Sequence, residues 1–340
     1  MESPPVTPGL TGLEAGAERD RPFHRDTRWR LGSLAIWIAF ECVVLGVVVA
    51  IGCAVSRHFL TPTALKTMVP SFLVLGLIVP AAVMIVASGG VDLSVGAVAA
   101  LVSVVAATVA GDSGLGVGVV AGLGVALGVG VAHAVLVGLA GMPAVLVTLA
   151  TMVGLRGVAC LLVDEQIVFL EASPPGAEES YAVFWIVLAA VAVAGIVLVH
   201  RTPLALRPGA GEPPESLWAR AVYVGGPYVL SALMAGVAGL VAVVRSRAGD
   251  PHVGQGWELE VLLAVVLGGT AWGGRFGCVV GALIGVVIVA LLYMMLTLAG
   301  LSGSWARVTV AGALVVFAGL GRLYYFVVAC LYRAARASRT

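Results

Sequence analysis

The chain has 340 residues, of which 60% are hydrophobic and only 11% charged, with a net charge of +1 at pH 7. Soluble domains carry about 25% charged residues, so this composition and a mean hydropathy of +1.08 exclude an ordinary soluble protein. The charges are confined to short patches between apolar runs of bilayer length. The sequence therefore predicts an all-α polytopic membrane protein.

The amino-terminal segment, residues 1–30, is polar, rich in proline, glycine and arginine, and without helical periodicity. Such a composition predicts a disordered tail. The apolar run that follows, residues 31–55, is too long for the core of a signal peptide. We expect it to be the first spanning helix.

Ten apolar runs of spanning length are expected, several of them short. They fall at about 31–55, 68–88, 93–110, 115–137, 143–163, 182–200, 221–244, 257–272, 276–298 and 305–328. Pro70 and Pro80 lie in the second run and predict a bend or a break there. This pattern predicts a transmembrane domain over residues 31–328, followed by a basic cytoplasmic tail at 329–340.

The positions of the cations predict the orientation, because cytoplasmic loops carry an excess of Lys and Arg. If both termini are cytoplasmic, thirteen cations lie inside, five lie outside and Arg156 lies within a span. The five outer cations are Arg57, Lys66, Arg245, Arg247 and Arg307. The loop at 164–181, which contains acidic residues and no cation, is then extracytoplasmic, and the loop at 201–220 is cytoplasmic.

The octet GGVDLSVG, residues 89–96, places a carboxylate, Asp92, between two apolar runs. Gly89 and Gly90 can adopt the left-handed geometry that ends a helix. Asp92, supported by Ser94, can accept the backbone N–H bonds that start the next helix. Transporters use such discontinuous helices beside their binding sites. We expect the octet to be a helix break next to a translocation path, with Asp92 as the cap.

Glycines at a spacing of four residues occur in the fourth run. They are Gly114, Gly118 and Gly122, and the pair Gly124 and Gly128. In a membrane, small residues at this spacing let helix backbones approach closely, so we expect this run to pack tightly on a neighbour.

Three further charged side chains lie at the predicted membrane depth. Arg156 is near the middle of the fifth run, where a cation usually faces the protein interior. It either pairs with helix-end carbonyls or with Asp92, or it lies along the solute path. Glu258 and Glu260 open the short eighth run, where carboxylates complement the positive end of a helix. Capping at the outer surface is their favoured interpretation.

Catalytic and cofactor-binding patterns are missing. The one lysine, Lys66, is not part of a phosphate-binding loop, so ATP hydrolysis by that route needs a separate chain. The five histidines and five cysteines are widely spaced, without metal-ligand or CxxC spacing. We therefore expect no cofactor and no metal. The sequence also shows no nucleophile and base of the kind that a polytopic membrane enzyme would need.

Three ordered stretches carry a family resemblance. "GGVDLSVGAVAAL", "GMPAVLVTLATMVGLRG" and "GQGWELEVLLAVVLGGTAWGGRFGCVVGALIG" resemble the membrane permease subunits of bacterial ABC importers for ribose, xylose, arabinose, galactose and similar sugars. The resemblance covers about 60–325. The positions that match the family pattern are Asp92, Ser94, Pro143, Thr148, Thr151, Arg156, Glu258, Gly268, Gly269 and Gly274.

The resemblance implies two permease subunits around a central path in the plasma membrane. It also implies a pair of cytoplasmic ATPase subunits and an extracytoplasmic solute-binding protein. The expected helix breaks and translocation path then involve Gly89, Gly90, Asp92, Ser94, Thr148, Thr151, Arg156 and Glu258.

One segment departs from the family pattern. Where the family has a short helix that docks on the ATPase, this chain reads "HRTPLALRPGAGEPPESLWARAVYV", and its prolines disfavour that helix. We expect the coupling loop to contain Arg207, Glu215, Trp218 and Arg220. The chain either pairs with a divergent ATPase or is the weaker half of a heterodimer.

The favoured function is that of a permease subunit that imports a monosaccharide or similar small polar solute by alternating access. The alternative is an ion-coupled secondary transporter, in which Asp92 and Arg156 would be the coupling residues. The sequence leaves the identity of the solute open.

Overall fold

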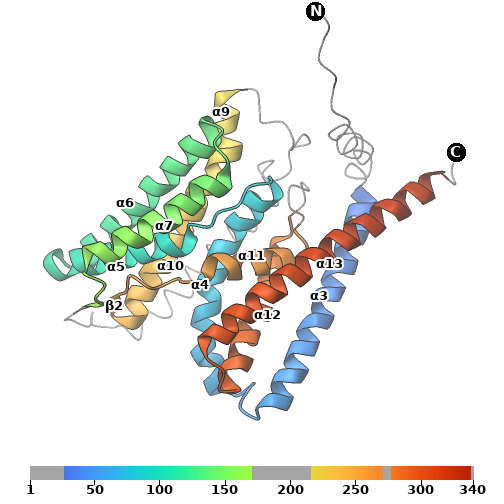
Figure 1. Ribbon diagram of the computed structural model, residues 1–340, viewed down its shortest axis with the longest axis horizontal. Helices are drawn as coiled ribbons and strands as arrows, with labels where there is room; N and C mark the ends of the chain where they lie inside the picture. Colours follow the sequence, from blue (N-terminus) through green and yellow to red (C-terminus); the bar gives the residue numbers. More distant parts are fainter. Residues whose placement is uncertain (1–26, 171–215, 271–276, 338–340) are drawn as a thin grey trace, which may run out of the picture.

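The computed structural model describes residues 27–170, 216–270 and 277–337 (Figure 1). Within these ranges the regular structure is helical except for two short strands. These are β1 (Val168–Phe169) and β2 (Ala248–Gly249), which pair antiparallel. The prediction of an all-α polytopic protein is confirmed.

Nine of the ten predicted runs form helices in the described ranges, and the run at 182–200 lies outside them. The helices are α3 (Thr27–Val55), α4 (Pro62–Ala87), α5 (Val95–Ser113), α6 (Leu115–His133), η1 (Ala134–Leu139), α7 (Ala144–Leu162), α9 (Leu217–Arg220), η2 (Ala221–Gly225), α10 (Gly226–Ser246), α11 (Trp257–Leu267), α12 (Val279–Leu298) and α13 (Gly303–Ala337). The elements η1 and η2 are π-helical and continue α6 and α9 without a gap. Seven of the described helical segments are long and apolar enough to cross a membrane.

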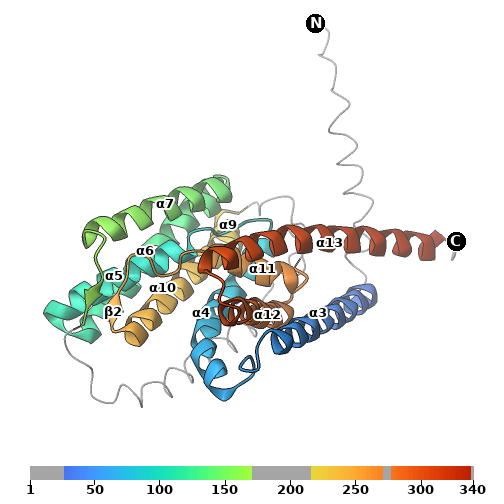
Figure 2. The same cartoon turned by 60° about the horizontal axis from the view of Figure 1, so that its bottom comes forward.

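The described helices form two groups that lie side by side (Figures 1 and 2). One contains α5, α6, α7 and α10, and the other contains α3, α4, α11, α12 and α13. Helix α4 joins the groups because it packs on α10 as well as on α11 and α12. The start of α5 and the start of α11 meet where the two groups adjoin.

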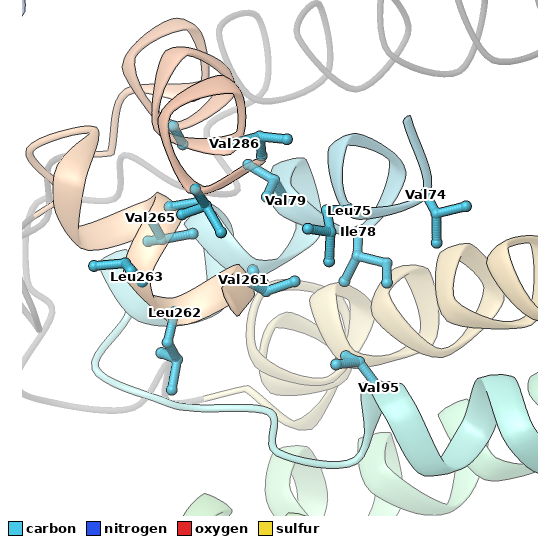
Figure 3. Packing of buried hydrophobic residues seen from close by; sticks show 14 of the residues in the cluster. Val74, Leu75, Ile78, Val79, Val95, Val261, Leu262, Leu263, Val265 and Val286 are labelled. Atoms are coloured by element: carbon cyan, nitrogen blue, oxygen red, sulfur yellow. The ribbon is translucent and has the colours of Figure 1, made fainter. Parts of the chain in front are cut away.

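A continuous apolar core runs through this junction. Figure 3 shows Leu75 and Ile78 of α4 close to Val261 of α11, with Val95 at the start of α5 below them. Glycines allow the backbones to approach: a Cβ on Gly285 of α12 would overlap the carbonyl oxygen of Ala264. Close contact of small residues is the usual way in which helices associate in a bilayer.

The glycine spacing in α6 is only partly a packing pattern. Gly118 and Gly122 pack on α5, as predicted, because added Cβ atoms would touch Ala106 and Val102. Gly124 and Gly128 have open space around them, so the prediction is wrong for these two. Gly114 instead starts the helix with a positive φ of 88°. Spacing alone did not show which face of α6 meets a neighbour.

Of the bend or break predicted at Pro70 and Pro80, the break is wrong, since α4 is one uninterrupted helix from Pro62 to Ala87. Each proline removes one backbone hydrogen bond. Packed neighbouring helices stabilise proline-containing helices in membrane proteins, and α4 contacts α10, α11 and α12. Tertiary packing therefore overrides the local signal.

Two helices extend past the predicted apolar runs. Helix α3 begins at Thr27, inside the segment expected to be a tail, and α13 continues to Ala337. Residues 27–30 and 329–337 are therefore helical, although they lie outside the apolar runs. Residues 1–26 and 338–340 lie outside the described ranges.

Candidate translocation site

Helix α4 ends at the glycine pair of the octet. The N–H of Ser88 donates to the carbonyl of Met84, and those of Gly89 and Gly90 donate to Val86 and Ile85. Gly89 has a φ of 91°, so its predicted left-handed geometry is confirmed. Gly90 does not have a positive φ, and that part of the prediction is wrong. A glycine at position 90 instead leaves room for the Tyr228 hydroxyl, which a Cβ there would overlap.

Asp92 is 8% exposed and accepts three hydrogen bonds. Its Oδ1 accepts from the backbone N–H of Ser94 at 2.9 Å and from the Ser94 hydroxyl at 2.6 Å. Its Oδ2 accepts from the hydroxyl of Ser231 on α10 at 2.7 Å. A carboxylate with several donors is stable in a buried site. Asp92 thus ties the octet to α10.

The prediction that Asp92 caps the next helix needs a correction. The N-cap of α5 is Ser94, and it makes no side-chain capping bond. Asp92 lies two residues before it and bonds one backbone N–H, that of Ser94. Its other oxygen bonds Ser231 of α10, so its main role is to join elements.

A second layer of polar groups surrounds the octet. The hydroxyls of Thr148 and Tyr228 approach the carbonyl oxygen of Val91 at 3.4 and 3.5 Å. His133 Nε2 and the hydroxyl of Thr151 are 2.9 Å apart, and the His133 and Tyr228 rings meet edge to face. The predicted residues Thr148 and Thr151 therefore belong to one buried cluster with Asp92.

Three members of this cluster were missed from the sequence: His133, Tyr228 and Ser231. Tyr228 and Ser231 are three residues apart and thus share one face of α10. His133 is a lone histidine in an apolar run. These were the available signals, but neither indicates that the two helices meet at the octet.

The link between α10 and α11 enters the interior of the subunit. Helix α10 ends at Arg247, which is left-handed at φ 53°. The N–H of Asp250 then donates to the Ser103 hydroxyl at 3.1 Å, and Gly254 lies against Gly96. The link thus follows the first turns of α5 back towards its start. There α11 begins, after positive φ angles at Gly254 and Gly256.

The position of α11 corrects the expectation for its two carboxylates. Its N-cap is Gly256, without a side-chain capping bond, and Glu260 is buried. One oxygen of Glu258 lies near Gly96, within 2.9 Å of where a Cβ would be. The surface location is therefore wrong for Glu260, whereas the carboxylate of Glu258 does lie on the backbone N–H groups of Gly256 and Glu258 at the helix start, as expected of a cap. The sequence could not show that the preceding link folds inward.

Arg156 connects α7 to this link. Its Nη1 donates to the carbonyl oxygens of Pro251 at 2.9 Å and Val253 at 2.6 Å. The described bonds of Asp92 all come from serine residues, so a pair between Asp92 and Arg156 is not formed. The predicted pairing with carbonyls is confirmed in kind, although these belong to a link and not to a helix end.

A groove of about 450 Å³ passes over Arg156 on the face formed by α7, α11, α12 and α13. Its lining residues are Met152, Val153, Arg156, Gln255, Gly256, Glu258, Leu259, Tyr293, Arg307 and Val310. Arg156 and Glu258 both line this groove, a guanidinium and a carboxyl group near each other. The structure thus divides the predicted set: Arg156 and Glu258 line the groove, whereas the octet and the two threonines form the buried cluster behind it.

The expected coupling loop is only partly described. Arg207 and Glu215 lie outside the described ranges. Trp218 and Arg220 were predicted to lie in a loop, and this is wrong. They lie in α9, which leads without interruption into α10. The Ser216 hydroxyl accepts from the N–H of Ala219 at 3.2 Å and starts this helix. Trp218 is 79% exposed on it.

The end of α11 repeats the end of α4. The N–H groups of Gly268, Gly269 and Thr270 donate to Ala264, Val266 and Val265, in the pattern of Ser88, Gly89 and Gly90. Gly269 is left-handed at φ 69°. The Trp37 indole N–H donates to the carbonyl of Leu267 at 2.6 Å. Gly274 lies outside the described ranges.

Comparison with known proteins identifies the family. Residues 223–319 match the family described as branched-chain amino acid transport system / permease component. The inner membrane ABC transporter permease protein YjfF of Escherichia coli K12 is 33% identical over 274 residues, which are 73% of this chain and 80% of that protein. The chain belongs to the permease subunits of bacterial ABC sugar importers.

Two further relatives agree with this assignment. The ribose import permease protein RbsC of Bacillus subtilis is 31% identical over 81% of this chain and 89% of its own length. The L-arabinose transport system permease protein AraH of Escherichia coli K12 is 29% identical over 83% of this chain and 90% of its own. No solved structure matches the chain.

The family assignment tells where this protein is located and that it has no ATPase activity of its own. This permease is a multi-pass protein of the plasma membrane and is not itself an enzyme, because ATP hydrolysis in these transporters takes place in a separate subunit. The groove and the buried cluster are therefore features of a transport subunit.

Proposed function

We propose that this permease imports a monosaccharide or similar small polar solute by alternating access, along the groove that contains Arg156 and Glu258. The observation that carries the proposal is a charged groove on the face of otherwise apolar helices. Charged groups inside a membrane usually mark a substrate pathway. The names of the relatives, which specify ribose and L-arabinose, support the solute class.

We further propose that a second permease subunit, identical or related, covers this face. Around the groove Val153 is 65% exposed, and Arg307 and Leu259 are exposed as well. A cation at the centre of a spanning helix costs about 3 kcal/mol against lipid, and Arg156 is the thirteenth of the nineteen residues of α7. A second subunit would keep lipid away from Arg156 and leave the groove as a central path.

The remaining partners follow from the family. We propose cytoplasmic ATPase subunits that contact the segment containing Arg207, Glu215, Trp218 and Arg220, and an extracytoplasmic solute-binding protein. Leu217 and Trp218, the first residues of the helix that continues into α10, are exposed and thus accessible to a partner. The prolines at 208, 213 and 214 disfavour the family's docking helix, so we propose either a divergent ATPase partner or a role as the weaker half of a heterodimer.

The proposed orientation, with both termini cytoplasmic, predicts opposite labelling of two exposed positions. In a cysteine-free background, an impermeant maleimide added to intact cells is expected to modify Gln166→Cys and to miss Leu217→Cys. Permeabilised cells, in which both react, provide the control. Labelling of Leu217→Cys from outside would reverse the topology and remove the ATPase-facing assignment.

The transport function predicts that Arg156→Ala stops uptake. The substitution leaves the carbonyls of Pro251 and Val253 without their donor and the groove without its central cation. Loss of such a charged donor costs about 1.5–3 kcal/mol, and we expect uptake to fall at least about tenfold. Uptake of labelled D-ribose, L-arabinose, D-xylose and D-galactose is measured in a deletion strain carrying the wild-type or variant gene. Arg57→Ala, in an exposed turn, is the matched control.

The same assay separates an ABC importer from an ion-coupled transporter. In a strain without ATP synthase, uptake should stop when arsenate depletes ATP and continue when a protonophore collapses the proton gradient. The opposite pattern would contradict the proposed function. So would failure of the wild-type gene to restore uptake of any of the four sugars.

A further inference from the structure

A second cavity, separate from the groove, reaches into the subunit and opens at the exposed residues Ile167, Phe169 and Arg245. It has a volume of about 610 Å³ and is bounded by α4, α5, α10, α11, α12 and the strand pair β1–β2. Aliphatic side chains of α4, α10 and α12 form much of its wall. Phe72, Trp257 and Tyr293 add aromatic surface. The charged groups on the wall are the carboxylates of Asp250 and Glu260 and the guanidinium of Arg245.

The first turn of α11 lies between the cavity and the groove. Glu258 lines the groove, whereas Glu260, two residues later, lines the cavity. Residues two apart point to different sides of a helix, so one turn presents a carboxylate to each space. Tyr293 of α12 borders both spaces, and its hydroxyl lies near the carboxyl group of Glu260. These two side chains form the partition.

The chemistry of the cavity selects its ligand. Its volume is in the range of sites for small molecules, about 300–1,000 Å³, and such sites combine apolar and aromatic walls with a few polar groups. Glu260 is only 9% exposed, so its carboxylate is held inside the protein, with Asp250 on the same cavity. Carboxylates accept hydrogen bonds from hydroxyl groups, and the guanidinium of Arg245, on the same cavity, can donate to hydroxyl oxygens. A neutral, polyhydroxylated ring fits this combination.

We propose that this cavity is a monosaccharide-binding compartment within a single permease subunit, distinct from the groove between subunits. Glu260 accepts hydrogen bonds from sugar hydroxyls there, and Trp257 and Tyr293 offer aromatic surface to the ring. The proposal rests on the proposed function, since it concerns the same class of solute. It adds a binding site on the far side of the partition formed by Glu260 and Tyr293.

Protection of an introduced cysteine tests the proposal. The reporters are Ala242→Cys for the cavity, Met152→Cys for the groove and Val120→Cys for the exposed apolar surface of α6. The five native cysteines are replaced by serine. At Cys278 this retains an acceptor for the N–H of Gly281. The purified full chain in lipid nanodiscs reacts with N-ethylmaleimide while D-ribose, L-arabinose, D-xylose or D-galactose is titrated.

At least one of the four sugars is expected to slow the modification of Ala242→Cys, by about threefold at twice its Kd, and to leave Val120→Cys unchanged. Glu260→Gln should remove the protection, because an amide replaces the carboxylate acceptor while the side-chain shape is kept. Glu258→Gln, on the same turn but facing the groove, should retain it.

Two results would overturn the proposal. One is an unchanged rate at Ala242→Cys with all four sugars, and the other is protection that persists in Glu260→Gln. If any of these sugars is nevertheless imported in the uptake assay, the proposed function stands and only the compartment is refuted. Protection confined to Met152→Cys would place the sugar in the groove alone.

Discussion

Gly96→Ala is expected to destabilise the junction of the two helix groups and to stop transport. The added Cβ would overlap the carbonyl oxygen of Gly254 and lie 2.9 Å from a Glu258 oxygen. Since the first obstacle is backbone, α5 and α11 must move apart. Overpacking of this kind costs about 1–3 kcal/mol. The thermal unfolding midpoint in nanodiscs and the sugar uptake rate measure the two effects.

Gly111→Ala in the same helix is the matched control. Nothing lies within 4 Å of a Cβ at that position. Alanine favours a helix over glycine by about 0.5–1 kcal/mol, so this variant should be as stable as the wild type or slightly more stable. Equal stability and equal uptake of the two variants would show that α5 and α11 do not meet at Gly96.

Asp92→Ala is expected to reduce stability and uptake strongly, whereas Asp92→Asn should retain most of both. Alanine leaves the N–H and hydroxyl of Ser94 and the hydroxyl of Ser231 without their acceptor. Each buried group without a partner costs about 1–3 kcal/mol. Asparagine keeps an oxygen for Ser94, and its amide can donate to the Ser231 oxygen. Unfolding midpoints and uptake at matched expression give the comparison.

Ser231→Ala refines this test, because it removes one of the three donors to Asp92 and leaves the two from Ser94. Its effect should lie between those of Asp92→Asn and Asp92→Ala. An Asp92→Asn variant that folds at wild-type yield but does not transport would contradict this structural role. The negative charge itself would then be required, as it would be in an ion-coupled transporter.

The ends of the helices were largely predictable because their signals are local. The glycine pair of the octet predicted the end of α4, and Gly89 has the expected left-handed backbone. Nine apolar runs became helices because run length and hydrophobicity act within each segment. The same local rules allowed a break at Pro70 or Pro80, which does not occur in α4, a helix packed on α10, α11 and α12.

The site depended on contacts that no local pattern contains. Asp92 bonds Ser231, 139 residues later, and Arg156 bonds carbonyls 95 and 97 residues later. The sequence by itself determined that this is a membrane permease of the sugar-importer family, with a break at the octet and a cation within a span. Only the tertiary structure decided that Arg156 and Asp92 do not pair, and that Glu258 and Glu260 face different spaces. The physical reason is that partners so far apart meet only when helix packing brings the link after α10 back to the start of α5.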